Sequence, residues 1–150
     1  MRKIKYIGVH CTGGLDSQSL ESIQAYWKNT LGWKNPGYHY LIFPDGTEVQ
    51  LLSEDKVSNG VKGFNSELIN VCYVGGMIIE NKKTVFTDTR TDSQKATMLS
   101  RLKKLKVKYP DAIIKGHRDF SPDLNGNGKV DYFEWIKVCP CFDAMEEYKL

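Results

Sequence analysis

The sequence predicts a single α/β domain with a central mixed β-sheet flanked by helices, and three observations lead to this fold class. A chain of 150 residues suits one domain of ordinary size, which buries roughly 70% of its unfolded surface. Hydrophobic residues make up 41% and charged residues 26% of the chain, as in folded proteins. Short apolar runs alternate with segments of helical periodicity. We therefore expect one domain over residues 1–150.

The first part of the chain predicts a strand, a helix and a hairpin. Residues 4–11 form an apolar run typical of a buried strand. Ser19 is a favourable N-cap for a helix that continues to about Leu31. Residues 37–43 and 48–52 flank a Pro-Asp-Gly turn, which indicates two antiparallel strands. The residues expected on the inner face of the helix are Leu20, Ile23, Tyr26 and Trp27.

Two more buried strands are expected in the second part of the chain. Residues 53–70 are rich in Ser, Asn and Gly, which indicates a loop, and residues 71–74 form the apolar run after it. Residues 112–116 predict a short strand that ends directly before His117. A central sheet assembled from these runs would bring several strand ends to one edge of the domain.

A long helix is expected between these two strands. Thr91 and Gln94 have the spacing of a capping box, in which each residue satisfies a free backbone group at the helix start. The helical pattern continues to about Tyr109, and Pro110 ends it. The apolar residues expected on its inner face are Ala96, Leu99, Leu102 and Leu105.

Charge and hydropathy exclude two classes of partner. The net charge of +3, from 21 basic and 18 acidic residues, is too small to indicate nucleic-acid binding. The basic cluster at residues 103–108 is typical of the solvent-facing side of a helix. No apolar run is long enough for a membrane span, and residues 4–10 are too short and too mixed for a signal-peptide core. We expect neither nucleic acid nor membrane insertion.

Two of the three histidines are candidate metal ligands. His10 and His117 each lie at the carboxyl end of a predicted strand, where active-site groups of α/β sheets gather. His39 lies between two tyrosines in a predicted strand, which indicates a packing residue or one that supports a ligand. Catalytic zinc takes three protein ligands and a water, so Cys139 is a natural third ligand. The residues alone leave the choice between Cys139 and Cys141 open.

Five segments, in this order along the chain, resemble the phage-endolysin and peptidoglycan-recognition-protein family of zinc-dependent N-acetylmuramoyl-L-alanine amidases. They are GVHCT (8–12), GYHY (37–40), VKGFNSELINVCYVGG (61–76), GHRDF (116–120) and KVCPCFD (137–143). Five ordered segments are more specific than any single one of them.

The resemblance implies an activity and assigns roles residue by residue. His10, His117 and Cys139 match the family's zinc ligands, and Tyr38 and Lys137 match the tyrosine and lysine that assist catalysis. The implied reaction is hydrolysis of the amide between N-acetylmuramic acid and L-alanine in peptidoglycan. Peptidoglycan or a muropeptide would be the substrate, and the protein would act as a monomer. We expect synthesis in the cytoplasm without a signal peptide, followed by holin-type or other non-secretory release to the cell wall.

The chain departs from the family pattern in three places. Cys141 replaces a serine of the phage enzymes, which indicates that it is not a ligand. Gly60 stands where some phage members carry a histidine, so any role of that histidine is lost here. Residues 123–134, DLNGNGKVDYFE, lengthen the connection between the second histidine and the lysine.

The inserted segment matches an EF-hand-like calcium loop. Oxygen donors recur at the spacing of such a loop, Gly128 occupies the position of its sharp turn, and Val130 that of its apolar residue. The expected Ca²⁺ ligands are Asp123, Asn125, Asn127, Lys129 through its backbone carbonyl, Asp131 and Glu134. Because the loop leads directly into the segment of Lys137 and Cys139, we expect Ca²⁺ to order that segment.

Three functions other than amide hydrolysis fit parts of the sequence less well. A non-catalytic peptidoglycan-binding module is the main alternative, but such relatives lack the cysteine ligand that Cys139 would supply here. A zinc nucleobase deaminase needs His-x-Glu, whereas Arg118 and Asp119 follow His117. A Cys–His hydrolase would use Cys11 with His117, but Cys11 alternates to the face opposite His10, which predicts a buried thiol.

Overall fold

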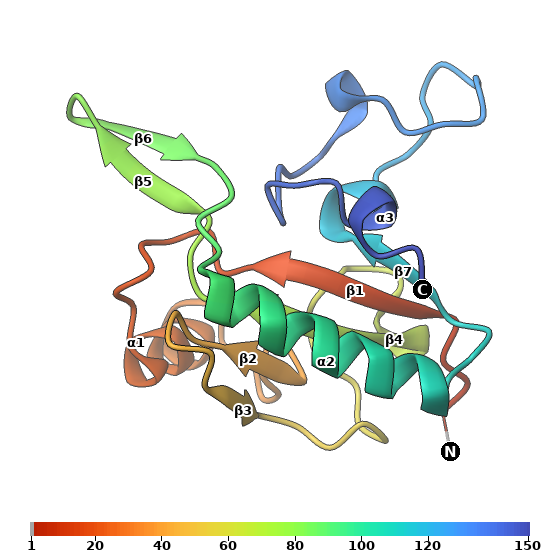
Figure 1. Cartoon of the computed structure of the whole chain (residues 1–150), viewed down its shortest axis with the longest axis horizontal. Coiled ribbons are helices and arrows are strands. Elements are labelled where there is room, and N and C mark those ends of the chain that lie inside the picture. The colour runs from red at the N-terminus through yellow and green to blue at the C-terminus, as the bar shows by residue number, and fades with distance from the viewer. Residues whose placement is uncertain (1) are drawn as a thin grey trace.

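A five-stranded mixed sheet forms the centre of the domain. The computed structural model describes residues 2–150, and its sheet has the strand order β3-β2-β4-β1-β7 (Figure 1). β1, β2, β4 and β7 run parallel, and β3 pairs antiparallel with β2. The strands are β1 Tyr6–Cys11, β2 Tyr40–Ile42, β3 Glu48–Gln50, β4 Leu68–Tyr73 and β7 Ile113–Gly116. The predicted fold class, a single α/β domain with a mixed sheet, is confirmed.

The long helix α2, Asp92–Lys108, lies across one face of the sheet (Figure 1). Its capping box forms as predicted, with the Thr91 hydroxyl accepting from Gln94 N–H and the Gln94 side chain accepting from Thr91 N–H. The side chains that it buries are Gln94, Met98, Leu102 and Leu105. The expectation for Ala96 is wrong, because this residue is exposed and Met98 turns toward the sheet instead.

The opposite face of the sheet is covered by α1, Leu20–Ala25, and by the π-helical turn Tyr26–Thr30 that continues it. Ser19 caps α1 as predicted, accepting from Ser22 N–H. Ile23 and Trp27 pack on this face, whereas Tyr26 is exposed. The sheet is therefore covered on both faces, as parallel strands require.

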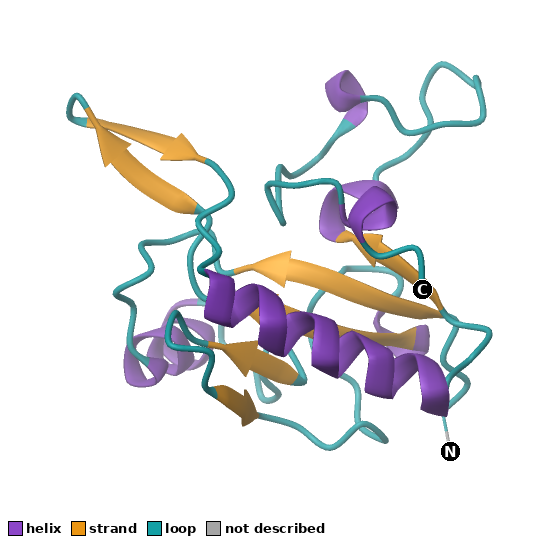
Figure 2. Ribbon diagram, in the orientation of Figure 1, coloured by secondary structure: helices purple, strands orange, loops and turns teal. Residues whose placement is uncertain are grey.

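Two segments project beyond the sheet on the same side of the domain (Figure 2). One is the hairpin of β5, Met77–Glu80, and β6, Lys83–Phe86, for which the sequence gives no prediction. The other comprises residues 121–138, between the short helical turn His117–Phe120 and the C-terminal segment with α3, Ala144–Glu147. Among residues 2–150, no helix is both long and apolar enough to span a membrane.

The structure also corrects the predicted strand boundaries. The strand predicted over residues 71–74 is β4, which begins at Leu68, so residues 68–70 belong to this strand and not to the predicted loop. The predicted strand 37–43 forms only over Tyr40–Ile42, and His39 lies just before it. Backbone pairing nevertheless reaches His39, whose N–H donates to Asn70 O at 3.0 Å.

Candidate metal centre and active-site cleft

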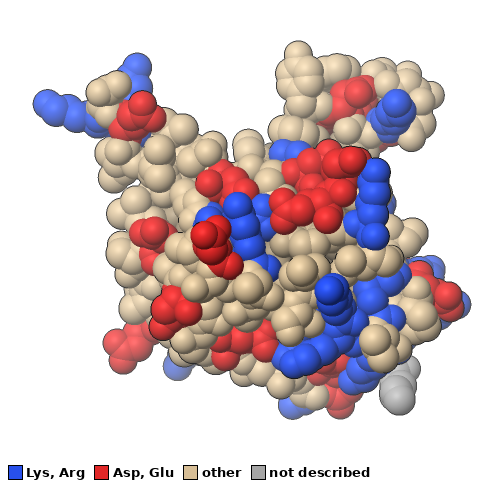
Figure 3. Space-filling view, viewed as in Figure 1, with Lys and Arg blue, Asp and Glu red and all other residues tan. Residues whose placement is uncertain are grey.

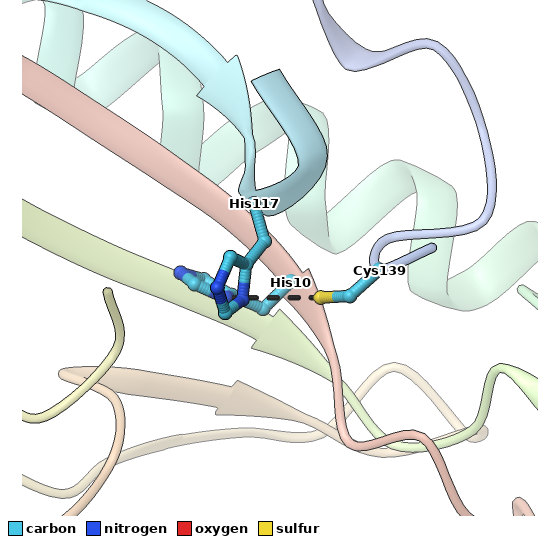
Figure 4. A group of neighbouring side chains, drawn as sticks. All are labelled: His10, His117 and Cys139. Atoms are coloured by element: carbon cyan, nitrogen blue, oxygen red, sulfur yellow. Dashed lines mark hydrogen bonds between the residues drawn. The ribbon is translucent and has the colours of Figure 1, made fainter. Parts of the chain in front are cut away.

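Three potential ligands from three distant parts of the chain converge at one edge of the sheet (Figure 4). His10 lies near the carboxyl end of β1, His117 directly follows β7, and Cys139 lies in the segment before α3. Their ligand atoms all lie within 4.8 Å of one another. The predicted placement of both histidines at carboxyl ends of parallel strands is confirmed.

The spacing and chemistry of these side chains fit a tetrahedral metal ion. His10 Nδ1 and Cys139 Sγ lie 3.8 Å apart, and two such ligands on tetrahedral zinc would be separated by about 3.6 Å. Two imidazoles and a thiolate are a donor set that zinc prefers, and three protein ligands leave a position for water or substrate. Within residues 2–150, no other group of three His, Cys, Asp or Glu side chains comes together in this way.

Both histidines are held in the neutral form that a metal requires. Burial lowers the pKa of His10 well below its usual value, and the neighbouring His117 lowers it further. Burial also lowers the pKa of His117 to about 4, and the charge of Lys137 acts in the same direction. At neutral pH each imidazole therefore keeps a free nitrogen lone pair for a metal.

The two C-terminal cysteines have different surroundings. The backbone N–H of Cys11 donates to Cys139 Sγ at 3.2 Å, a contact that holds the sulfur close to the two histidines. The N–H of Arg118 donates to Cys139 O at 2.9 Å, which ties this segment to the turn of His117. Cys141 Sγ instead lies 3.9 Å from Cys11 Sγ and 3.5 Å from Gly76 O, outside the ligand cluster.

Tyr38 and Lys137 both line the cleft in front of the cluster. The Tyr38 ring lies 5.1 Å from the His10 ring, centre to centre, and its hydroxyl lies 3.5 Å from Cys11 O. Burial raises the pKa of Tyr38 well above its usual value, so the phenol keeps its proton. Lys137 is exposed at the cleft edge, and its charge lowers the pKa of both histidines.

The cleft has a volume of about 800 Å³, is lined mostly by residues 11–38 and reaches both projecting segments. In the space-filling view a notch separates the β5–β6 hairpin from residues 121–138 (Figure 3). Phe86 of the hairpin and Ile136 of the second segment both line the cleft, and Trp27 and Trp33 line it from the α1 side. The cleft is thus open and partly aromatic, and His117 and Cys139 are among its lining residues.

Behind the cluster lies a hydrogen-bonded polar group that the sequence reading missed. His10 Nε2 lies 2.7 Å from Asn70 Oδ1, and Asn70 contacts both Ser58 and His39. His39 thus lies outside the ligand cluster. Asn70 was missed because residues 53–70 read as a loop; the apolar neighbours Ile69 and Val71 were the available signal for a strand.

The inserted loop is ordered by its own side chains. The Glu134 carboxylate accepts from the backbone N–H groups of Leu124, Asn125 and Asp131 at 2.8–3.0 Å. Asp123 accepts from Gly128 N–H at 2.8 Å, the residue of the sharp turn. These contacts order the loop and leave the expected Ca²⁺ binding a prediction.

Comparison with known proteins gives the same family as the motifs. The family model described as N-acetylmuramoyl-L-alanine amidase matches residues 1–132, a range that includes His10, Tyr38 and His117 but ends before Lys137 and Cys139. An endolysin of Klebsiella phage KP32 is 35% identical over 139 residues, covering 91% of this chain and 80% of the relative. An uncharacterised protein of Haemophilus influenzae is 42% identical over 84 residues, covering 56% of this chain and 70% of the relative.

The fold is also that of a solved endolysin. The Ph2119 endolysin of a Thermus scotoductus bacteriophage superposes with a TM-score of 0.70 at 23% identity, covering 93% of this chain and 79% of that one. The matches in sequence and fold span most of the chain, and the range of the family model includes two of the three clustered side chains. The chain belongs to the N-acetylmuramoyl-L-alanine amidase family, and its family model and endolysin relatives support amidase activity on peptidoglycan.

Proposed function

We propose that the protein is a zinc-dependent hydrolase that cuts the amide bond between N-acetylmuramic acid and L-alanine in peptidoglycan. The observation that carries this proposal is the convergence of His10, His117 and Cys139 beside an open cleft. Family membership supplies the bond and substrate class, and the donor set supplies the metal. Zinc, when bound, would polarise the amide carbonyl and activate water.

Lys137 and Tyr38 are the two side chains placed to assist this reaction. The Lys137 ammonium would stabilise the negative charge that develops on the carbonyl oxygen, since it lies at the cleft edge near both histidines. Tyr38 keeps its proton because burial raises its pKa, so its hydroxyl can donate a hydrogen bond and relay a proton toward the leaving amine. The two roles are separable, because neither residue belongs to the ligand cluster.

The cleft would bind the substrate across the metal centre. Trp27, Trp33 and Phe86 offer aromatic surfaces, which suit the apolar faces of sugar rings and the aliphatic parts of a stem peptide. The exposed Lys137 and the backbone around Gly13 and Gly14 add polar contacts at the same site. An elongated glycopeptide that contacts the β5–β6 hairpin and residues 121–138 together would place its amide over the ligand cluster.

The decisive experiment is mass spectrometry of purified peptidoglycan digested by the protein. We expect fragments with a free L-alanine amine and intact glycan strands, released by the zinc-loaded protein and not after chelation. Intact glycan with no free amine, together with retention of the protein on the sacculi, would instead indicate a non-catalytic binding module. Cleavage between sugars or within the stem peptide would refute the bond assignment.

We also propose that the loop over residues 123–134 binds Ca²⁺ through Asp123, Asn125, Asn127, Lys129, Asp131 and Glu134. The spacing of oxygen donors supports this proposal, as does the hydrogen bond from Gly128 N–H to Asp123. The loop leads into the segment of Lys137 and Cys139, so bound Ca²⁺ would stabilise the active site. Action on the cell wall, as the names of the endolysin relatives suggest, completes the proposed role.

A further inference from the structure

A chain of four buried polar side chains runs from the metal centre into the domain. His10, Asn70, Ser58 and His39 are each 0% exposed. His10 Nε2 lies 2.7 Å from Asn70 Oδ1, Asn70 Nδ2 lies 2.6 Å from Ser58 Oγ, and Ser58 Oγ lies 3.1 Å from His39 Nδ1. Because buried polar groups must be satisfied, the direction of each hydrogen bond can be worked out along the chain.

Two backbone groups fix the direction at the His39 end. The N–H of Asn70, which can only donate, lies 3.0 Å from His39 Nδ1. Nδ1 is therefore the unprotonated nitrogen of His39, and Nε2 carries the proton and donates to Lys56 O at 2.8 Å. Arg2 Nη2 lies 3.3 Å from the same Nε2 but donates to Glu54 O at 2.8 Å, so it does not alter this assignment.

The remaining directions follow from this tautomer. Because His39 Nδ1 carries no proton, Ser58 can bond it only by donating its single hydroxyl proton, which shares the Nδ1 lone pair with the Asn70 N–H. Ser58 Oγ then has only lone pairs for Asn70, so the side-chain NH₂ of Asn70 faces Ser58 and its carbonyl oxygen faces His10. An acceptor 2.7 Å from His10 Nε2 requires a proton on that nitrogen, which leaves His10 Nδ1 unprotonated and facing Cys139 Sγ.

Two glycines make room for the amide that joins the two histidines. A Cβ at Gly60 would lie 2.3 Å from Asn70 Cγ and Oδ1, and a Cβ at Gly8 would lie 2.9 Å from Asn70 Oδ1 and 3.0 Å from His10 Nε2. Gly8 pairs with Asn70 across β1 and β4. Neither glycine has a positive φ, so space rather than backbone conformation requires a glycine at these positions.

We propose that Asn70 is a positioning residue for the metal centre, which holds His10 as the Nε2–H tautomer and so directs its Nδ1 lone pair at the metal. Ser58 and His39 orient the Asn70 amide. The other tautomer would place two acceptors 2.7 Å apart in a buried site, which carries a large penalty. This inference rests on the proposed role of His10 as a ligand, and it adds the residue that selects which nitrogen binds.

The first test is the tautomer itself, read by ¹⁵N–¹H NMR of the imidazoles in metal-free protein at neutral pH. In the wild type we expect a protonated Nε2 and an unprotonated Nδ1 at His10. Asn70→Asp, which keeps an acceptor at this position, should preserve that pattern. Asn70→Leu, which removes the acceptor at similar volume, should give a mixture of tautomers. A wild-type His10 protonated on Nδ1, or an Asn70→Leu variant with the wild-type pattern, overturns the proposal.

The second test is zinc affinity, measured by competition with a chromophoric chelator. Loss of a partner that orients a metal-binding histidine typically weakens binding about 10–100-fold, and we expect this for Asn70→Leu. Ser58→Ala should show a smaller loss of zinc affinity. This variant also tests the proposal if Asn70→Leu does not fold. Gln94→Leu is the matched control, because Gln94 is an equally buried amide whose NH₂ bonds Ile42 O and Val74 O away from the cluster.

The outcomes separate this inference from the proposed function. If Asn70→Leu and Ser58→Ala bind zinc as tightly as Gln94→Leu, the positioning role is wrong although His10 remains a ligand. If His10→Ala retains full zinc affinity, His10 is not a ligand and the proposed metal centre fails. The tautomer measurement on metal-free protein stands independently of either result.

Discussion

Replacing Cys139 separates its role as a metal ligand from its role in the fold. Cys139 Sγ faces His10 Nδ1 at 3.8 Å and also accepts the N–H of Cys11 at 3.2 Å. Cys139→Ala removes both contacts, whereas Cys139→Ser keeps an acceptor for the N–H but replaces a thiolate by a neutral hydroxyl. Cys141→Ser is the matched control, because Cys141 is the adjacent cysteine outside the cluster.

The loss of stability expected for metal-free Cys139→Ala comes from the Cys11 N–H, which loses its hydrogen-bond acceptor. Leaving a buried donor without a partner costs about 1–3 kcal/mol. For a chain of this size, 1 kcal/mol shifts the melting temperature by about 2–4 °C, so metal-free Cys139→Ala should melt roughly 2–12 °C below the wild type. Cys139→Ser should melt near the wild type, because its hydroxyl can accept the same N–H.

The stabilisation by bound zinc is a separate quantity, which depends on Cys139 as a ligand. With free zinc at 1,000 times Kd, binding stabilises the folded state by about 4 kcal/mol, which corresponds to a rise of roughly 8–16 °C in melting temperature. We expect this rise in the wild type and in Cys141→Ser. Both Cys139 variants should lose it, since neither alanine nor a hydroxyl replaces a thiolate on zinc.

Differential scanning fluorimetry after chelation, with and without added zinc, measures both quantities on the same samples. Metal content of the dialysed proteins by mass spectrometry gives an independent reading of zinc retention. A Cys139→Ser protein that gains as much from zinc as the wild type would refute the ligand assignment. Loss of the zinc response in Cys141→Ser would show that the wrong cysteine has been chosen.

Three further predictions address catalysis, pH and calcium. Lys137→Met should lower the turnover of peptidoglycan roughly 10²–10³-fold without loss of zinc, and reduced zinc content would assign Lys137 to the metal site instead. The pKa of His117 is lowered to about 4 from 6.5, so below pH 6.5 the unfolded chain binds a proton that the folded chain does not. Urea unfolding of metal-free protein should therefore show roughly 3 kcal/mol of stability lost as pH falls from about 6.5 to about 4, and His117→Gln should lack this component. Calorimetric titration should detect Ca²⁺ binding, and Glu134→Gln should weaken it. If no heat of binding is detected and EGTA leaves the melting temperature unchanged, residues 123–134 do not bind Ca²⁺ and are only a polar insertion.

Most of the fold could be predicted because its elements carry strong local signals. The run at the start of the chain predicts β1, and the Thr91 capping box predicts the start of α2. The β5–β6 hairpin could not be predicted in the same way, since residues 77–86 are largely exposed. It pairs only within itself, so its sequence lacks the continuous apolar run of the central strands.

The candidate site was predictable in its ligands but not in its supporting residues. His10 and His117 follow from their positions at strand ends, which is a property of the local pattern. The choice of Cys139 over Cys141 came from family resemblance, and the structure places only Cys139 beside the histidines. Asn70 contacts His10, and Ser58 contacts Asn70, through tertiary packing alone, and no spacing in the sequence indicates either contact.

Asn70 explains both why the predicted start of β4 is wrong and why the sequence does not indicate a residue that positions His10. An asparagine is unfavourable inside a buried strand, and Asn70 ends a stretch rich in Ser, Asn and Gly that predicts a loop. In the structure it is fully buried and every polar atom of its amide has a partner. A residue that breaks the local rule for a strand needs compensation from elsewhere, and here Gly8, Gly60 and Ser58 supply the space and the hydrogen bond. These compensating contacts indicate that Asn70 is present for its contact with His10 rather than for the stability of the fold. Asn70→Leu tests this explanation, because it should lose zinc affinity even if it melts at the wild-type temperature.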